Sequence, residues 1–151
     1  MATTATGTTT DRSGRIPVSR ILRAGLIAAV LAAIVNSVIS QIARVILDAP
    51  DAFAPLRLPA VLLSTVGFIL LGTVVFLGIS RFARRPVQVF QIAAVIALLL
   101  SFSNPFFILN AESERFAGIT GPIIAVLLLM HTAAAAITVT ILSRTGRGQT
   151  R

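Results

Sequence analysis

The sequence predicts an all-α protein that crosses a lipid bilayer as a bundle of four transmembrane helices with both termini in the cytoplasm. Of its 151 residues, 56% are hydrophobic and only 12% are charged, about half the charged fraction of a typical soluble domain. Four uncharged segments are long enough to span a bilayer, which takes about 20 apolar residues. The arginines cluster in three segments beside these runs, which indicates membrane topology.

The four uncharged segments cover residues 24–43, 58–80, 86–111 and 116–143. After allowance for loops, we expect helices over residues 22–46, 59–80, 87–109 and 120–143. The first connection, DAPDAFAPLRLP, holds three prolines and two aspartates and predicts an irregular loop. The second, RFARRP, predicts a tight turn in which Pro86 opens the third helix. NAESERFAGIT predicts the third loop, and Gly121-Pro122 starts the fourth helix.

These helices belong to one membrane domain, residues 20–144, between a Thr/Arg-rich cytoplasmic tail at 1–19 and a second tail at 145–151. The first fifteen residues lack large apolar side chains, so we expect them to be disordered. A basic segment followed by AGLIAAVLAAIV also fits a cleaved signal peptide. The apolar run continues past a typical signal sequence, however, and no clean A-x-A cleavage site follows.

The distribution of charge predicts the orientation. All thirteen basic residues are arginines, and ten of them lie before residue 24, at residues 81–85 or after residue 143, on one side of a four-span model. Four of the five acidic residues lie on the other side: Asp48, Asp51, Glu112 and Glu114. The positive-inside rule places the arginine-rich side in the cytoplasm, where it can contact anionic lipids. The Arg- and Ala-rich composition suggests a bacterial cytoplasmic membrane. The arginines lie in short clusters beside apolar runs, a pattern of membrane topology rather than of nucleic-acid binding.

The segment VNSVISQIAR places polar residues in the second half of the first helix. At about 100° per residue, Asn36, Ser37, Ser40, Gln41 and Arg44 fit within an arc of roughly 140°. Small residues at positions 25, 29 and 33 fall in the same arc. Lipid cannot satisfy amide or guanidinium groups, so we expect this face to point into the bundle.

Depth connects this face with polar residues of other spans. At about 1.5 Å per residue, Asn36 and His131 both lie ~20 Å from the inner arginines. Further outward, ~24–31 Å from these arginines, lie Ser64, Thr65, Ser101, Asn104 and Arg44. The inner half has few polar residues beyond Thr73, Thr138 and Thr140. Pro105 would bend the third helix and free the Ser101 carbonyl. The sequence therefore predicts an intramembrane polar site, open to the outside, formed by Asn36, Gln41, Arg44, Ser101, Asn104 and His131.

Each of these side chains also has a structural interpretation. Asn36 and Gln41 can form interhelical hydrogen bonds or contact a substrate. His131 can be a neutral ring bonded to Asn36 or to another helix, or it can accept a proton. Arg44 can reach outer headgroups, pair with Asp48 or bind an anion. Small-residue seams at Gly25-Ala29-Ala33 and Thr132-Ala136-Thr140 indicate helix packing.

The spacing of Asn36 and Arg44, with LLLMHTAAAA in the last span and an arginine just after it, resembles the domain-of-unknown-function family 6069. The resemblance covers most of residues 20–144 and is weakest in the third span. It implies a small four-span membrane protein, chiefly from actinobacteria. The asparagine, arginine and histidine positions of the family would correspond to Asn36, Arg44 and His131. The resemblance implies no activity.

We therefore predict a non-enzymatic membrane protein that acts as a scaffold or binds a partner, such as a second copy or another membrane protein. The alternative is a small transporter or ligand-binding protein with the outward-facing polar pocket. One histidine, no cysteine and no carboxylate within a span supply neither catalytic residues nor a metal or cofactor site.

Overall fold

The computed structural model describes residues 16–49, 53–103 and 119–147. Within these ranges the chain is helical and contains no strand, which confirms the predicted all-α class. The α-helices are α1 (Val18–Ile46), α2 (Leu58–Phe82), α3 (Pro86–Ser101) and α5 (Gly121–Arg147), and a short 3-10 helix, η1 (Ala54–Leu56), precedes α2.

Prolines mark where most of the helices begin. Pro17 is the N-cap residue of α1, and α2 and α3 both have proline within their first two positions. Proline is tolerated there because the first N–H groups of a helix have no intrahelical partner. At the other end of α1, Asp48 has a φ of 45°, and the Ala49 N–H donates to the Arg44 carbonyl at 3.2 Å. This left-handed residue and its bond end the helix as a glycine often does.

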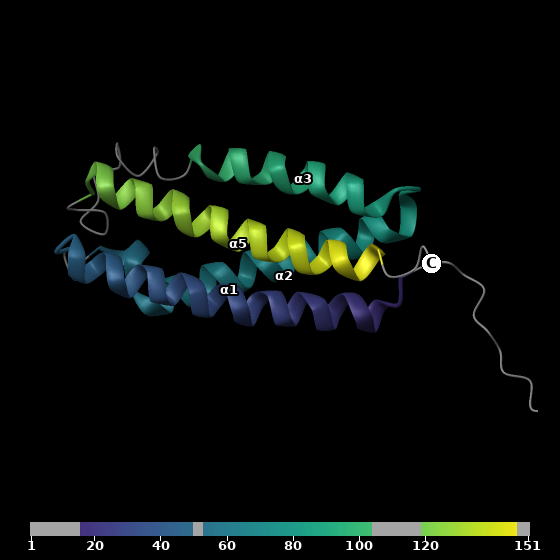
Figure 1. Cartoon of the computed structure of the whole chain (residues 1–151), viewed down its shortest axis with the longest axis horizontal. Helices are drawn as coiled ribbons and strands as arrows, with labels where there is room; N and C mark the ends of the chain where they lie inside the picture. The colour runs from purple at the N-terminus through teal and green to yellow at the C-terminus, as the bar shows by residue number, and fades with distance from the viewer. Residues whose placement is uncertain (1–15, 50–52, 104–118, 148–151) are drawn as a thin grey trace, which may run out of the picture.

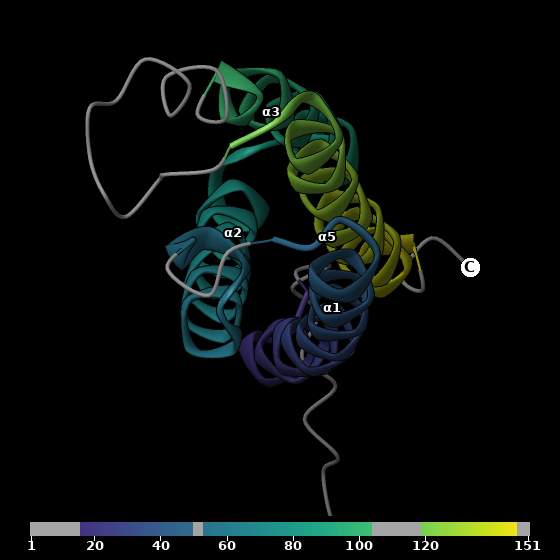
Figure 2. The same cartoon turned by 90° about the vertical axis from the view of Figure 1, so that its left-hand side faces the viewer.

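The four α-helices form an antiparallel bundle (Figure 1). Helix α1 packs against α2 on one side and α5 on the other, and α3 packs against α5 and, less extensively, α2. Seen end-on, α1 and α3 therefore occupy opposite corners (Figure 2). This arrangement decides which polar residues can meet, because a side chain of α1 faces α2 or α5 before it can face α3.

The core is divided into three clusters along the bundle. Large side chains, among them Ile21, Phe76, Phe90 and Leu142, fill the end of the bundle where α1 begins and α5 ends. A second cluster around Phe53 and residues of α2 and α5 fills the opposite end. Between them, alanines of α1 pack against Ile69. Small side chains in the middle of α1 let its neighbours approach closely.

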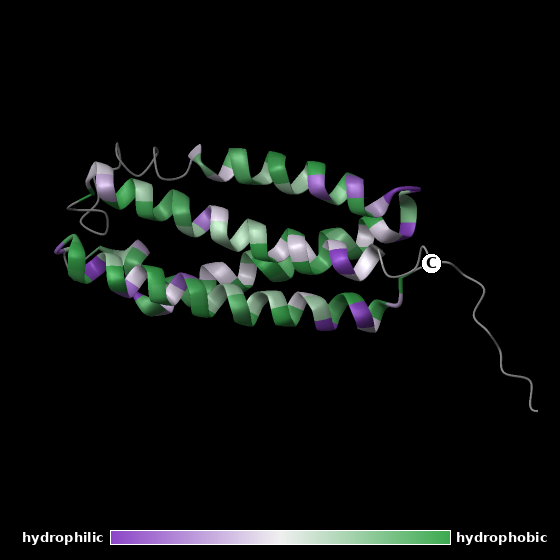
Figure 3. Cartoon of the chain, viewed as in Figure 1, coloured by the Kyte–Doolittle hydropathy of each residue, from purple (hydrophilic) through white to green (hydrophobic). Residues whose placement is uncertain are grey.

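The surface of the bundle suits a lipid environment. Three helices, α1, α2 and α5, are long and apolar enough to cross a membrane, and α3 is a shorter apolar helix. Hydrophobic residues dominate along all four helices (Figure 3), and many large apolar side chains point outward. On α3, Phe90 alone is buried. Because so large an apolar surface is unsuited to water, the chain is a membrane protein.

Several helix ends differ from the predicted bounds. Helix α1 begins at Val18, and α5 continues to Arg147, into the segment predicted as a tail. The prediction followed the apolar runs, but a helix needs only its backbone hydrogen bonds and can continue at the headgroup level, where arginines reach water. Helix α3 ends at Ser101, short of the predicted residue 109. Pro105, the last part of that span and the first fifteen residues lie outside the described residues.

Candidate functional site

Asn36 is the centre of the polar face that the sequence predicts. It is buried at 3% exposure on the side of α1 that faces α2. Its Nδ2 donates a hydrogen bond to the Thr65 Oγ1 at 3.1 Å. The bond joins two helices inside the bundle, which is the structural interpretation of Asn36. Thr65 was absent from the predicted site, although its depth in the second span matches that of the polar residues.

Two buried polar atoms beside this bond have no partner. The Asn36 Oδ1 and the Ser37 Oγ are both enclosed, and neither forms a hydrogen bond within the described part of the chain. An unsatisfied buried group costs about 1–3 kcal/mol, and native proteins rarely retain one without a reason. The hydrogen bond to Thr65 therefore uses one of the two N–H donors of the Asn36 amide and leaves its oxygen without a partner.

His131 lies half-buried on α5 and bonds within its own helix. Its Nδ1 is 2.6 Å from the Leu127 carbonyl oxygen. A carbonyl can only accept, so Nδ1 carries a proton, and in the neutral ring Nε2 is left as an acceptor. The hydrogen bonds of the described residues do not join His131 to Asn36 or to another helix: the Asn36 amide donates to α2, and the His131 Nδ1 donates within α5.

Gln41 is exposed, so the expectation that it faces the interior is wrong. The buried stripe of α1 runs through Ala33, Asn36, Ser40 and Ala43. Measured from Asn36, these residues fall between roughly −20° and 60°, whereas Gln41 lies near 140°. The predicted arc was wider than the face that two neighbouring helices cover. Near its edge, Ser37 and Arg44 are half-buried.

The structure does not bring all six predicted residues together. Ser101 is half-buried on α3, and its hydroxyl donates to the Leu98 carbonyl at 2.7 Å. Helix α3 lies diagonally across the bundle from α1, which carries Asn36 and Arg44. Asn104 lies outside the described residues. The pair observed is thus Asn36 with Thr65, and the six-residue pocket stays a prediction.

A second polar contact between helices lies nearer the end of the bundle where α1 begins and α5 ends. Gln91 on α3 donates from Nε2 to the Ser143 Oγ on α5 at 3.4 Å, and Ser143 is 1% exposed. The expectation of few polar residues in this half of the bundle left out Gln91, although it is a polar side chain within an apolar span. Within residues 16–49, 53–103 and 119–147, no three His, Asp or Glu side chains gather as a metal site would need.

Removing the Asn36–Thr65 hydrogen bond should destabilise the bundle. We expect Asn36→Leu and Thr65→Val each to lower the free energy of unfolding, with a coupling energy of roughly 0.6–1.7 kcal/mol in a double-mutant cycle. The measurement is the unfolding of the parent, the two single variants and the double variant in mixed detergent micelles, followed by circular dichroism. Gln41→Leu is the matched control, because its side chain is exposed on the same helix, and it should change the free energy little.

The opposite result would change the interpretation of Asn36. If Asn36→Leu is neutral or stabilising and the coupling energy is zero, the amide is not retained for packing. It would then be a polar group kept at a cost to stability, as residues of functional sites often are.

Comparison with known proteins gives one finding. The model of a family of unknown function, DUF6069, matches residues 16–148, which is nearly the whole chain. No curated protein and no solved structure matches it.

Proposed function

This chain belongs to the family of unknown function DUF6069, and we propose that it acts without catalysis, by binding another transmembrane helix through the outer face of α5. We take a second copy of the chain as the first partner to test. The proposed location is the cytoplasmic membrane of a bacterium, with both termini in the cytoplasm.

The observation that carries this proposal is the different exposure of the two small-residue seams. Gly25, Ala29 and Ala33 of α1 are buried, so the first seam is used within the chain. The second seam, Thr132, Ala136 and Thr140 of α5, is exposed along its whole length. Small residues at four-residue spacing let two helices approach closely in lipid, where van der Waals packing drives association. The outer seam offers this contact to a helix from another molecule.

The arginines support the proposed orientation. The antiparallel bundle brings the N-terminal end of α1, the turn between α2 and α3 and the C-terminal end of α5 to the same end (Figure 1). This end carries Arg20, Arg23, Arg81, Arg84, Arg85 and Arg144, whereas Arg44 and Arg57 lie at the other. The positive-inside rule assigns the richer end to the cytoplasm.

A larger side chain in the outer seam should separate the copies. We expect Ala136→Leu to weaken self-association by about tenfold, or roughly 1.4 kcal/mol, because a leucine keeps the helices apart. Förster transfer between labelled proteins, measured over a range of protein-to-lipid ratios, gives the dimer fraction. The matched control is Ala97→Leu, the same change at an exposed alanine of α3, and it should leave the dimer fraction unchanged.

If the parent protein is monomeric at every ratio, α5 does not bind a second copy. In that case the proposal survives only if a different membrane protein crosslinks at residue 136 in cells, in the parent and not in Ala136→Leu. Equal effects of Ala136→Leu and Ala97→Leu would contradict a specific role for the outer seam.

One observation favours a second function, a small transporter or ligand-binding protein. The unpartnered Asn36 Oδ1 and Ser37 Oγ lie inside the bundle, where a polar ligand or an ordered water would satisfy them. The Asn36→Leu measurement tests this second function, because a neutral or stabilising substitution favours the ligand-binding role.

A further inference from the structure

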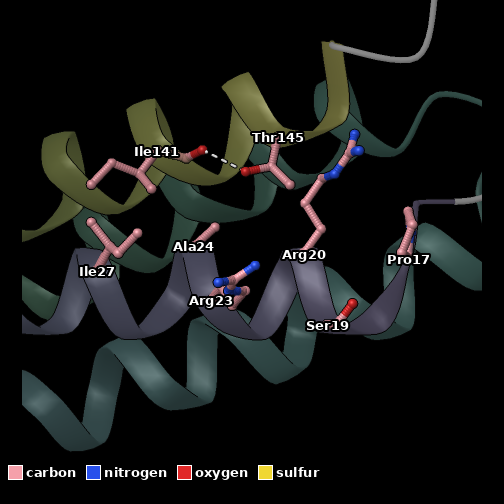
Figure 4. A pocket seen from close by; sticks show the side chains of 8 residues that line it. All are labelled: Pro17, Ser19, Arg20, Arg23, Ala24, Ile27, Ile141 and Thr145. Atoms are coloured by element: carbon pink, nitrogen blue, oxygen red, sulfur yellow. Dashed lines mark hydrogen bonds between the residues drawn. The ribbon is translucent and has the colours of Figure 1, made fainter.

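A groove runs between the N-terminal part of α1 and the C-terminal part of α5, at the arginine-rich end of the bundle (Figure 4). Its volume is about 550 Å³. It is open to the outside of the bundle, which in a membrane protein is the side where lipids lie. Its walls are Pro17, Ser19, Arg20, Arg23, Ala24 and Ile27 of the α1 end, with Ile141 and Thr145 of α5.

The groove has a polar half and an apolar half, and at each level α1 and α5 contribute side chains of the same kind. Arg20 reaches from α1 toward the end of α5 that carries Thr145 (Figure 4). Further into the membrane, Ile27 of α1 and Ile141 of α5 face one another across the groove. Seven residues separate Arg20 from Ile27, which is about 10 Å along the helix axis. This is the sequence of surfaces that a lipid molecule presents, first its headgroup and then the start of its acyl chains.

The polar half is positively charged. Arg20 and Arg23 are both exposed, and the first turn of α1 contains no acidic residue. Within the described residues the one acidic side chain is Asp48, at the far end of α1. The Thr145 hydroxyl donates to the Ile141 carbonyl at 3.1 Å, so the donors available to a ligand come mainly from the two arginines. Guanidinium groups bind phosphate through paired charge-assisted hydrogen bonds.

From these features we propose that the groove binds one anionic phospholipid. Arg20 and Arg23 hold its phosphate, and Ile27 and Ile141 contact the upper part of an acyl chain. A free phosphate would use the arginines but not the apolar half. A zwitterionic lipid would fit the apolar half, but its own ammonium group would reduce the charge complementarity. The site is independent of the α5 outer seam, which lies on Thr132, Ala136 and Thr140.

The test measures binding of phosphatidylglycerol to the purified full chain in a zwitterionic detergent, by native mass spectrometry. We expect the parent protein to retain one phosphatidylglycerol in preference to phosphatidylcholine of the same chain length. The double variant Arg20→Gln/Arg23→Gln should bind it roughly tenfold or more weakly. The matched control is Arg84→Gln/Arg85→Gln, which removes the same charge from two exposed arginines that do not line the groove.

Each outcome decides the proposal. If both double variants lose phosphatidylglycerol equally, binding follows general surface charge and the groove is not a site. If soluble glycerol 3-phosphate competes as well as the lipid, the ligand is a free phosphate and the apolar half has no role.

Circular dichroism checks that the variants fold. The variant Arg20→Lys/Arg23→Lys keeps the charge and should restore part of the preference for phosphatidylglycerol. The dimer fraction of the parent and of Arg20→Gln/Arg23→Gln should be equal, so failure here leaves the α5 proposal untouched.

Discussion

Replacing Phe76 with alanine should lower the free energy of unfolding by about 2–4 kcal/mol. The Phe76 side chain is 0% exposed, and its ring lies 4.8 Å from that of Phe90, between centroids, at an angle of 56°. Alanine would leave a cavity between α2 and α3. In water such a change typically costs 3–5 kcal/mol. We expect less here, because lipid solvates the exposed phenylalanine of the unfolded state, so the cost is mainly lost packing.

Phe82→Ala is the matched control, because it removes the same ring from the same helix at a side chain that is 92% exposed. Unfolding in mixed micelles should show a free energy for Phe82→Ala close to that of the parent protein. Equal effects of the two substitutions would contradict the packing of α2 against α3. A large loss for Phe76→Ala alone would confirm that this contact anchors α3, whose other side chains are exposed or half-buried.

Gly25→Ala should destabilise the bundle by about 1–3 kcal/mol, the usual cost of overpacking a core. A β-carbon on Gly25 would lie 2.9 Å from the Cβ of Thr73 and would overlap the rest of that side chain. Thr73 is 2% exposed, and its hydroxyl donates to the Ile69 carbonyl at 2.8 Å. A β-branched side chain in a helix has little rotamer freedom, so α1 and α2 would have to move apart.

Gly67→Ala supplies a control of opposite sign. A β-carbon on Gly67 meets nothing within 4 Å, and alanine favours the helix over glycine by about 0.5–1 kcal/mol. The control should therefore be neutral or slightly stabilising in the same unfolding measurement. Combining Gly25→Ala with Thr73→Gly removes the overlapping atoms and should recover part of the loss. A neutral Gly25→Ala would show that the α1–α2 contact is looser than the structure describes.

These two substitutions also bear on the proposed functions. Phe76 and Gly25 both lie inside the bundle, whereas Ala136 and Arg20 lie on its surface. The interior changes should alter unfolding, and the surface changes should alter binding. A surface variant that unfolds as readily as Phe76→Ala would not report on a partner or a lipid.

The sequence predicted the polar face of α1 better than it predicted the contacts of that face. Periodicity identified Asn36 and Ser40 as interior residues, because a helix turns by a fixed angle per residue. It did not identify Gln41 as exposed, because the width of the buried face depends on how the neighbouring helices cross α1. The partner of Asn36 was missed for the same reason. Depth made His131 a possible partner, and α5 packs against α1 as extensively as α2 does, so only the direction in which the Asn36 side chain points favours Thr65.

Local composition by itself determined the helical class, the apolar runs and the clustering of arginine beside them, because lipid requires each span to satisfy its own backbone. The tertiary structure alone decided which small-residue seam is used within the chain and which faces outward. It alone formed the groove between Arg20 and Ile141, which are far apart in the sequence. Both depend on the packing of α1 between α2 and α5, and in a bilayer that packing follows from close side-chain fit that no single segment contains.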